Sequence, residues 1–136
     1  MKNKLFIILL CFFSFGFSQE GKVINHIFKG NEKAQEKEYV EAEKAYREAL
    51  SLAPEKAKAL FNLGNTHFLD KKYQEASQRF FQTQKFATSK EDKHKAFHNM
   101  GNVYMQEKDY QKAVEAYKSA LRLSLIHISE PTRLGF

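Results

Sequence analysis

The stretch from Leu60 to Thr88 reads LFNLGNTHFLDKKYQEASQRFFQTQKFAT, and its spacing of small and aromatic residues decides the fold. A glycine is followed after nine, twelve and sixteen residues by a tyrosine, an alanine and an aromatic residue: Gly64, Tyr73, Ala76 and Phe80. The same pattern begins at Gly30 and at Gly101, so it returns after 34 and then 37 residues. A period of about 34 residues with such fixed offsets is typical of arrays of helix-turn-helix units.

The spacing predicts an all-α solenoid of about three units, each made of two helices. A glycine in the first helix and an alanine in the second allow the two backbones to approach. The aromatic residues are expected to fill the wedge between neighbouring units. One helix pair cannot bury its apolar face alone, so stacked units share a core.

These residues resemble the tetratricopeptide repeat (TPR). The third unit reads FHNMGNVYMQEKDYQKAVEAYKSALR from Phe97 to Arg122, and the first is clearest in EYVEAEKAYREALSLAP, which ends at Pro54. The first half of the first unit keeps the Gly-Asn pair but carries Lys29 in place of the usual leucine. The expected repeats span 23–56, 57–93 with a short inserted loop near ATSKEDKHK, and 94–122.

The first eighteen residues are expected to be a signal peptide. Lys2 and Lys4 precede an apolar stretch of thirteen residues, Leu5 to Phe17, which is shorter than the ~20 residues of a spanning helix. Small residues at 16 and 18 favour cleavage before Gln19, and an uncleaved membrane anchor is the alternative. The single cysteine lies inside this segment, so the mature chain is expected to have no thiol chemistry.

The last fourteen residues break the repeat. LSLIHISEPTR, from Leu123 to Arg133, resembles the translation of a transposon-type sequencing-library adapter. We therefore expect residues 123–136 to be foreign to a native chain that continues beyond Arg122, with a divergent native tail as the alternative. If the tail is foreign, the last helix lacks the neighbour that should cover it, and Tyr117 and Leu121 are expected to be more exposed than Phe80.

The charge pattern argues against nucleic acid as a partner. The formal net charge is +6, but both signs alternate along the expected helices, as in Glu32 to Glu48. This pattern is typical of a solvated face with i,i+4 ion pairs and contains no basic cluster with interleaved aromatic residues. We expect no small-molecule substrate and no cofactor.

No group of side chains has the context of a catalytic site, so the chain is expected not to be an enzyme. His94 and His98 share a helix face but lack the glutamate of a metal-binding HExxH motif, and no metal site is expected. His67 stands where the repeat usually has a tyrosine, which favours a position in the packed core or at the edge of the groove.

The asparagines at one place in each unit are the best candidates for binding a partner. Two interpretations remain open: each amide pairs with the backbone of an extended peptide, or it orients the neighbouring helix. In TPR proteins the first helix of each unit lines the concave groove, which the resemblance extends to this chain. The expected peptide-binding residues are Asn31, Lys58, Asn62, Asn65, Lys95, Asn99 and Asn102.

The resemblance also bears on the class of peptide. TPR domains that grip a terminal carboxylate use a lysine and an asparagine from the first unit, an asparagine from the second and two basic residues from the third. Asn31, Asn62 and Lys95 fit that pattern. Ile27 and Asn99 stand where basic residues are needed, which disfavours a complete carboxylate clamp. Lys58 and Lys95 still suggest a preference for acidic or C-terminal segments.

The phrases FNLGNTHF (Phe61 to Phe68) and KAFHNMGNVYMQEKDYQKAVEAYKSALR (Lys95 to Arg122) resemble exported TPR proteins of bacterial aerotolerance (Bat) operons. That resemblance implies a protein-interaction scaffold in the periplasm or envelope, assembled with membrane-anchored von Willebrand A-type partners. A general periplasmic TPR adaptor for envelope biogenesis or secretion is one alternative. The other is the N-terminal fragment of a larger exported enzyme or sensor.

Overall fold

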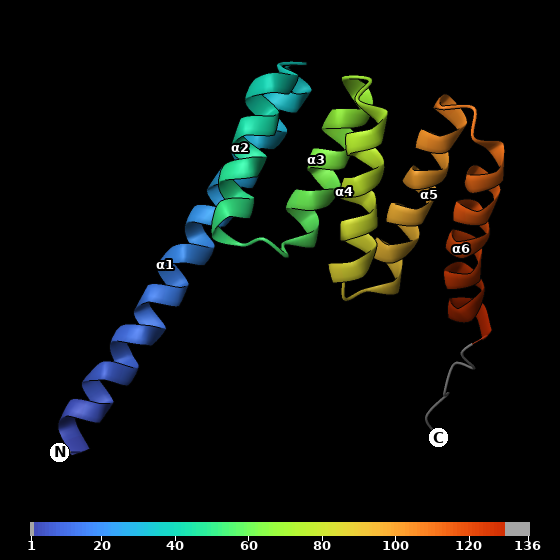
Figure 1. The fold of residues 1–136 in the computed structure, drawn as a ribbon. Helices are drawn as coiled ribbons and strands as arrows, with labels where there is room; N and C mark the ends of the chain where they lie inside the picture. The colour runs from blue at the N-terminus through green and yellow to red at the C-terminus, as the bar shows by residue number, and fades with distance from the viewer. Residues whose placement is uncertain (1, 130–136) are drawn as a thin grey trace. The chain divides into compact units, whose positions relative to one another are not determined.

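The computed structural model describes the backbone of residues 2–129 and the side chains of residues 19–125 (Figure 1). Within that range the secondary structure is helical: α1 (Lys2–Gln35), α2 (Tyr39–Leu52), α3 (Ala57–Leu69), α4 (Tyr73–Phe86), α5 (Lys90–Gln106) and α6 (Tyr110–Ser129). The expected all-α fold of about three helix pairs is confirmed. The chain divides into two compact units, Met1–Pro54 with α1 and α2, and Glu55–Phe136 with α3 to α6.

The same turn joins the two helices of every pair. The second residue before the next helix is a lysine with a positive φ of 60–62° in each case: Lys37, Lys71 and Lys108. In the middle pair, the amide of Lys71 donates to the carbonyl of Phe68 at 3.1 Å and that of Lys72 donates to His67 at 2.8 Å. This is the Schellman arrangement that satisfies the last carbonyls of a helix.

The turn also begins the second helix. Lys72 accepts a hydrogen bond at its carbonyl from the amide of Ala76 at 3.0 Å, and Asp109 does the same for Ala113. Because one residue both completes the cap and starts the next helix, the two helices have little freedom of direction. The recurring tyrosine therefore marks the first residue of each second helix, at Tyr39, Tyr73 and Tyr110.

The glycines of the pattern receive aromatic rings. A Cβ built on Gly64 would lie 2.7 Å from the ring of Phe80, and one on Gly30 would lie 2.5 Å from the ring of Tyr46. Tyr117 occupies the same place against Gly101. The glycine therefore makes room where the two helices of a pair meet, because the space of its missing side chain is taken by the aromatic residue sixteen positions later on the second helix.

In the first unit, α1 packs on α2 through Val23 and Ile27, which are 1% and 5% exposed. Lys29, at the place of the usual leucine, is exposed. The amide side chain of Gln19 donates to the carbonyl of Leu52 at 2.9 Å, which ties the two helices together at this end. The incomplete first half of this repeat therefore still forms a packed helix.

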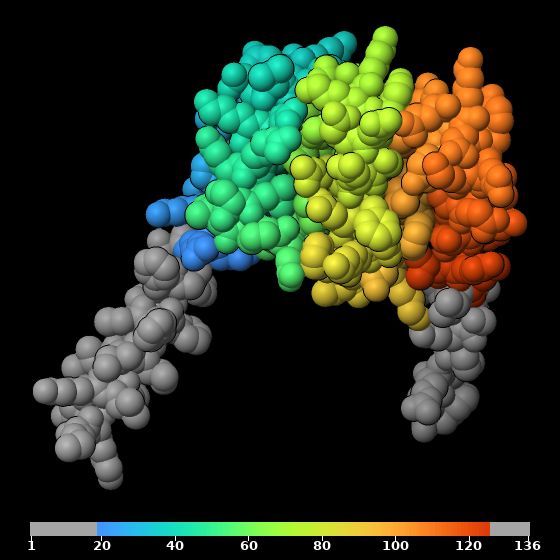
Figure 2. Space-filling model, in the orientation of Figure 1, coloured from blue at the N-terminus to red at the C-terminus, as the bar shows by residue number. Residues whose placement is uncertain are grey.

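In the second unit, α5 packs against both α4 and α6. The core cluster contains Ala76 and Phe80 of α4, Met100 and Val103 of α5, and Ala116 of α6. Figure 2 shows the side chains of α3 to α6 as one closely packed body. Phe80 therefore fills the space between consecutive pairs, as the sequence predicts for the recurring aromatic residue. His67 is 2% exposed, so of the two predicted positions this histidine occupies the packed core.

The three inserted residues do not form the expected loop. Only residues 87–89 separate α4 from α5, and the insertion lengthens the start of α5, which has 17 residues against 13 in α3. Ser89 caps the helix by accepting a hydrogen bond from the amide of Asp92 at 3.0 Å. With Glu91 and Asp92 in the first turn, the added residues are favoured in a helix.

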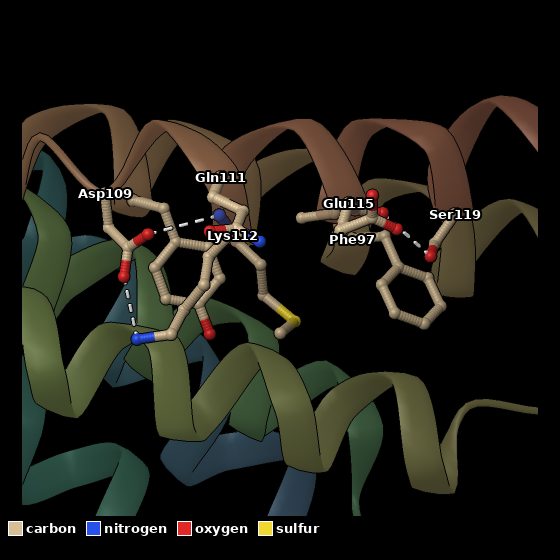
Figure 3. Close-up of a pocket in the computed structure, with 9 residues that line it drawn as sticks. Phe97, Asp109, Gln111, Lys112, Glu115 and Ser119 are labelled. Atoms are coloured by element: carbon tan, nitrogen blue, oxygen red, sulfur yellow. Dashed lines mark hydrogen bonds and ion pairs between the residues drawn. The ribbon is translucent and has the colours of Figure 1, made fainter.

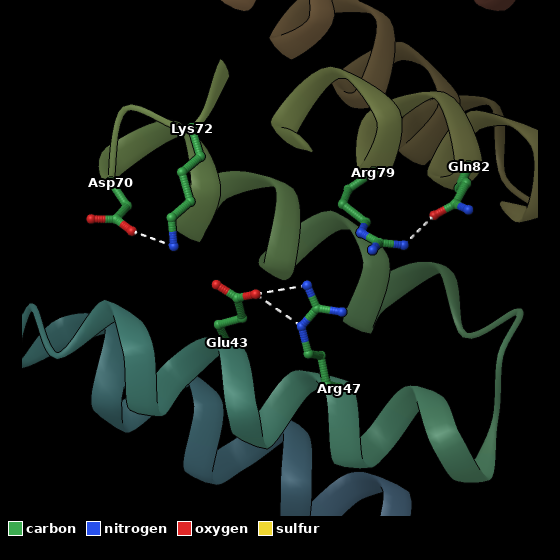
Figure 4. A network of polar contacts seen from close by, with 6 residues as sticks. All are labelled: Glu43, Arg47, Asp70, Lys72, Arg79 and Gln82. Carbon is green, nitrogen blue, oxygen red and sulfur yellow. Dashed lines mark hydrogen bonds and ion pairs between the residues drawn. The ribbon is translucent and has the colours of Figure 1, made fainter. Parts of the chain in front are cut away.

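The surface carries ion pairs, including i,i+4 pairs of the kind that the alternating charges predict. Glu43 and Arg47 are joined at 2.7 Å at i,i+4 spacing on α2, and Asp70 and Lys72 are joined at 2.9 Å beside the turn after α3 (Figure 4). Such exposed pairs contribute typically less than about 1 kcal/mol each. They keep the outer surface solvated without specifying the fold.

The structure describes the two ends of the chain only in part. The helical backbone of α1 includes residues 2–18, but the side chains of the predicted signal peptide lie outside the described residues. Helix α6 includes residues 123–129, and residues 130–136 also lie outside the description.

In the described part of the chain, no helix is both long and apolar enough to cross a membrane. Tyr117 is half-buried and Leu121 is 56% exposed against 1% for Phe80, as expected.

Candidate functional site

Helices α3 and α5 present their polar residues at helical spacing on one face each. Lys58, Asn62 and Asn65 follow one another at four and three residues on α3, and Lys95, Asn99 and Asn102 do so on α5. Residues at these intervals share a helix face. Six of the seven predicted peptide-binding residues therefore line two neighbouring pockets, and Asn31 lies in the first unit.

The first of these, the amide pocket, has a volume of about 340 Å³. Its lining combines three amides with three apolar side chains: Asn65, Asn99, Asn102, Phe68, Leu69 and Phe80. The asparagines are half-buried, and Leu69 is 54% exposed. The pocket can therefore offer hydrogen bonds and apolar contact to the same short stretch of a partner.

Two of the recurring asparagines orient a neighbouring helix. The hydroxyl of Tyr46 donates to Oδ1 of Asn31 at 2.7 Å, and the hydroxyl of Tyr117 donates to Oδ1 of Asn102 at 2.7 Å. Each bond joins the first helix of a pair to the second. For these two residues the structure supports the helix-orienting interpretation.

Asn65 is different because Phe80 stands where the other pairs have a tyrosine. Phe80 has no hydroxyl, and Oδ1 of Asn65 instead accepts a hydrogen bond from Nδ2 of Asn99 at 2.9 Å. Among residues 19–125, no further partner contacts Nδ2 of Asn65 or Oδ1 of Asn99. This amide pair therefore keeps one donor nitrogen and one acceptor oxygen available at the pocket.

The second, the lysine pocket, also has a volume of about 340 Å³. Its lining includes Lys58, Asn62 and Lys95, as predicted, together with Phe61, Thr83, Ala57 and Asp92. The ammonium group of Lys95 donates to Glu91 at 2.6 Å, and this bond raises the pKa of Lys95. Two carboxylates, Glu91 and Asp92, thus accompany the two lysines and offset much of the positive charge inferred from the sequence.

The residues that sequence reasoning missed are those that shape the pockets. Phe68, Leu69 and Phe80 form the apolar part of the amide pocket, and Asp92 adds a carboxylate to the lysine pocket. The sequence could have predicted the Glu91–Lys95 ion pair, since residues of opposite charge four apart on a helix are neighbours. No sequence pattern predicts that Phe80 lines the amide pocket, because this depends on where its ring lies once the helices pack.

The histidines of α5 form a cluster with α6. Nδ1 of His94 lies 2.8 Å from the carbonyl oxygen of Ala120, and the rings of His94 and His98 stack at 6.3 Å. The ring of His98 meets that of Tyr117 edge-on at 5.5 Å. In the part of the chain that the structure describes, no three potential ligands gather around a common point for a metal ion.

A larger pocket of about 590 Å³ lies between α5 and α6 and contains none of the predicted residues (Figure 3). Two of its charged side chains form an ion pair: Nζ of Lys112 lies 2.8 Å from Oδ2 of Asp109. The same Nζ atom lies 5.6 Å from the ring centre of Tyr104. Hydrogen bonding to Lys112 lowers the pKa of Asp109. The charged groups of this pocket are therefore paired with one another, whereas the amide pocket is lined by neutral amides.

Comparison with known proteins gives the repeat family. A tetratricopeptide repeat model matches residues 94–124, and a TPR repeat model matches residues 30–70. None of the curated proteins is similar to this chain in sequence.

Solved structures share the fold. A crystal structure of MamA is 19% identical in sequence to this chain, with a TM-score of 0.74. The match covers 79% of this chain and 61% of the MamA chain, so this chain spans less than two thirds of the length of MamA. The N-terminal domain of stress-induced protein-1 (STI-1) from C. elegans is 21% identical with a TM-score of 0.75, covering 77% of this chain and 86% of its own. The second TPR of Spaghetti (RPAP3), bound to the HSP90 peptide SRMEEVD, is 21% identical with a TM-score of 0.69. This match covers 78% of the present chain and 97% of the RPAP3 domain.

The repeating turn, the ring seated on each glycine and the two matching family models lead to the same conclusion. The chain is a tetratricopeptide repeat protein.

Proposed function

We propose that this chain is a non-enzymatic scaffold that binds an extended segment of a protein partner between α3 and α5. The observation that carries the proposal is the Asn65–Asn99 pair, which keeps a donor and an acceptor at the edge of an apolar pocket. A peptide bond offers the complementary acceptor and donor. TPR domains in general are protein-interaction scaffolds, and the RPAP3 structure with SRMEEVD is one example of this fold holding a peptide.

The described contacts favour a neutral stretch of the partner over a terminal carboxylate. Of the two positions where a carboxylate clamp needs basic residues, Ile27 is 5% exposed in the first unit and Asn99 is bonded to Asn65. Lys95 is held by Glu91. The preference for acidic segments that the lysines suggested is therefore not part of this proposal.

Removing both members of the amide pair should weaken binding. We expect Asn65→Ala with Asn99→Ala to lower affinity about tenfold or more, since each lost hydrogen bond costs about 0.5–1.5 kcal/mol. The probe is a peptide enriched from a phage-displayed random dodecapeptide library on the full chain, then resynthesised for calorimetry. Asn25→Ala, at an exposed position of α1, is the matched control.

Circular dichroism should show unchanged helicity in the double variant. An enriched peptide that binds the double variant as tightly as the wild type would exclude this groove, and so would a library that yields no enriched peptide.

We further propose that the protein is exported and works in the cell envelope, within an aerotolerance complex with membrane-anchored von Willebrand A-type proteins. The support is the charged, apolar and small-residue order of residues 1–18 and the resemblance of 61–68 and 95–122 to exported Bat-operon TPR proteins. A general periplasmic adaptor is the alternative, and the genes beside this one distinguish the two. A larger exported enzyme or sensor is the third candidate, which the full reading frame tests.

Export makes a prediction about the N-terminus. We expect the protein isolated from its host to begin at Gln19, whose side chain already bonds to Leu52 in the folded unit. Intact-mass spectrometry of the periplasmic fraction measures this. A chain that still begins at Met1 and remains with the membrane would support the anchor in place of the cleaved signal.

A further inference from the structure

A second, apolar groove lies on the side of α5 that faces away from the amide pocket. Phe97, Met100 and Tyr104 recur after three and four residues and therefore share one face of α5. By the same spacing, Asn99 and Asn102 belong to the opposite face, where the amide pocket lies. This groove is therefore a different surface from the one proposed above to bind an extended segment.

Two adjoining pockets that share Tyr104 make up this surface, which we call the aromatic groove. Its floor is Phe97, Met100 and Tyr104 of α5, and its walls include Phe81 of α4 and Ala116 of α6. The pocket of about 590 Å³ lies along α6, and in Figure 3 its labelled side chains lie on the side where the ribbon of α4 passes. The other pocket, of about 470 Å³, lies along α4.

The corresponding face of α3 is closed. Leu60, Leu63 and His67 stand thirty-seven residues before the three floor residues and are at most 2% exposed. On α5 the two aromatic floor residues are half-buried, and Phe81 on the wall is 55% exposed. The aromatic groove therefore leaves apolar surface in water, which the apolar side chains of a partner can cover.

The charges around the groove leave one lysine for a partner. On the α6 side the charged groups are paired, Asp109 with Lys112 at 2.8 Å and Glu115 with Lys118 at 3.1 Å. On the α4 side, Lys85 is exposed, and no carboxylate among residues 19–125 pairs with it. A carboxylate of the partner complements this lysine at the edge of the apolar surface.

The chemistry of the groove fits a helix better than an extended chain. Its floor is apolar apart from the hydroxyl of Tyr104, and it is bordered by helices whose backbone groups bond within each helix. An extended segment would bury amides there without partners, whereas a helix satisfies its own. A partner helix can also insert rows of side chains between two neighbouring helices, as in helix-in-groove recognition.

We propose that the aromatic groove binds an amphipathic helix of a protein partner, as an interaction surface separate from the amide pocket. The apolar stripe of that helix packs on Phe81, Phe97 and Met100, and an aspartate or glutamate near one of its ends pairs with Lys85. The chain then holds two partner segments at once, one on each face of α5.

The test uses the full chain and a phage-displayed library of an alanine-based helix whose i, i+3, i+4 and i+7 face is randomised. Enriched helices should carry large apolar residues on that face and an acidic residue near one end. In calorimetry with the resynthesised helix, Phe81→Gln should weaken binding about tenfold or more, because it removes apolar surface from the contact. Lys85→Gln should weaken binding about two- to fivefold and reduce its dependence on salt, as expected for one exposed ion pair.

Leu69→Gln is the matched control, because Leu69 is 54% exposed, as Phe81 nearly is, but lies at the amide pocket. It should leave binding of the helix unchanged, and Phe81→Gln should leave binding of the library-selected dodecapeptide unchanged, so the two proposals fail separately. A library that yields no enriched helix would overturn the inference, as would enriched helices that bind Phe81→Gln as tightly as the wild type. Loss of binding in Phe81→Gln with none in Lys85→Gln would overturn the acidic helix as the occupant.

Discussion

Phe80→Ala is expected to lower the free energy of unfolding by about 3–5 kcal/mol, the usual cost of deleting a large buried ring. The ring is 1% exposed and joins α4 to α5 and α6 through Met100, Val103 and Ala116. It also fills the space above Gly64, so its removal leaves a cavity within a pair as well as between pairs. Small domains have about 5–15 kcal/mol of stability in total, so the loss is severe.

Urea unfolding followed by circular dichroism measures this loss. Tyr117→Ala is the matched comparison, because Tyr117 occupies the equivalent place against Gly101 but is half-buried. We expect it to cost less than Phe80→Ala, even though it also removes the hydrogen bond to Asn102. Equal losses at the two positions would contradict the central role assigned to Phe80.

Ala76→Leu is expected to lower the free energy of unfolding by about 1–3 kcal/mol through overpacking. Ala76 is 0% exposed in α4, at the start of the cluster that contains Phe80 and Met100. The added carbon atoms have no space there, so the helices must separate or the ring of Phe80 must leave its rotamer. For a chain of this size, the melting temperature should fall by several degrees.

Gln74→Leu, two residues earlier on α4 at an exposed position, adds an apolar side chain without crowding and should change stability by less than about 0.5 kcal/mol. Thermal melts of both variants compare them directly. An unchanged melt for Ala76→Leu would mean that the assigned face of α4 is wrong.

The sequence predicted the helix pairs because the signals for them are local and recur. Gly64, Ala76 and Phe80 sit at the same offsets as their counterparts in the other units, and the glycine, alanine and aromatic positions are buried as expected for Gly64, Ala76 and Phe80. The length of α5 was also readable, since Ser89 stands three residues before Asp92 as a helix-capping pair, yet the insertion was assigned to a loop.

The face of the candidate site was predictable for the same reason. Lys58, Asn62 and Asn65 share a helix face by spacing alone, and the structure places them at the two pockets with their counterparts on α5. What spacing did not provide was the shape of the pockets, whose apolar lining includes Phe80 of α4. A residue on another helix enters a site through packing, which no local pattern records.

The sequence by itself determined the repeat, the number of helices and the place of the recurring asparagines, because short-range spacing fixes which residues share a helix face. Only the tertiary structure decided what each asparagine does. The hydroxyls of Tyr46 and Tyr117 come from fifteen residues away and the amide of Asn99 from thirty-four, so the partners meet only after the helices pack. Three asparagines that each follow a glycine therefore have different partners: Asn31 and Asn102 accept from a tyrosine hydroxyl, whereas Asn65 accepts from another asparagine.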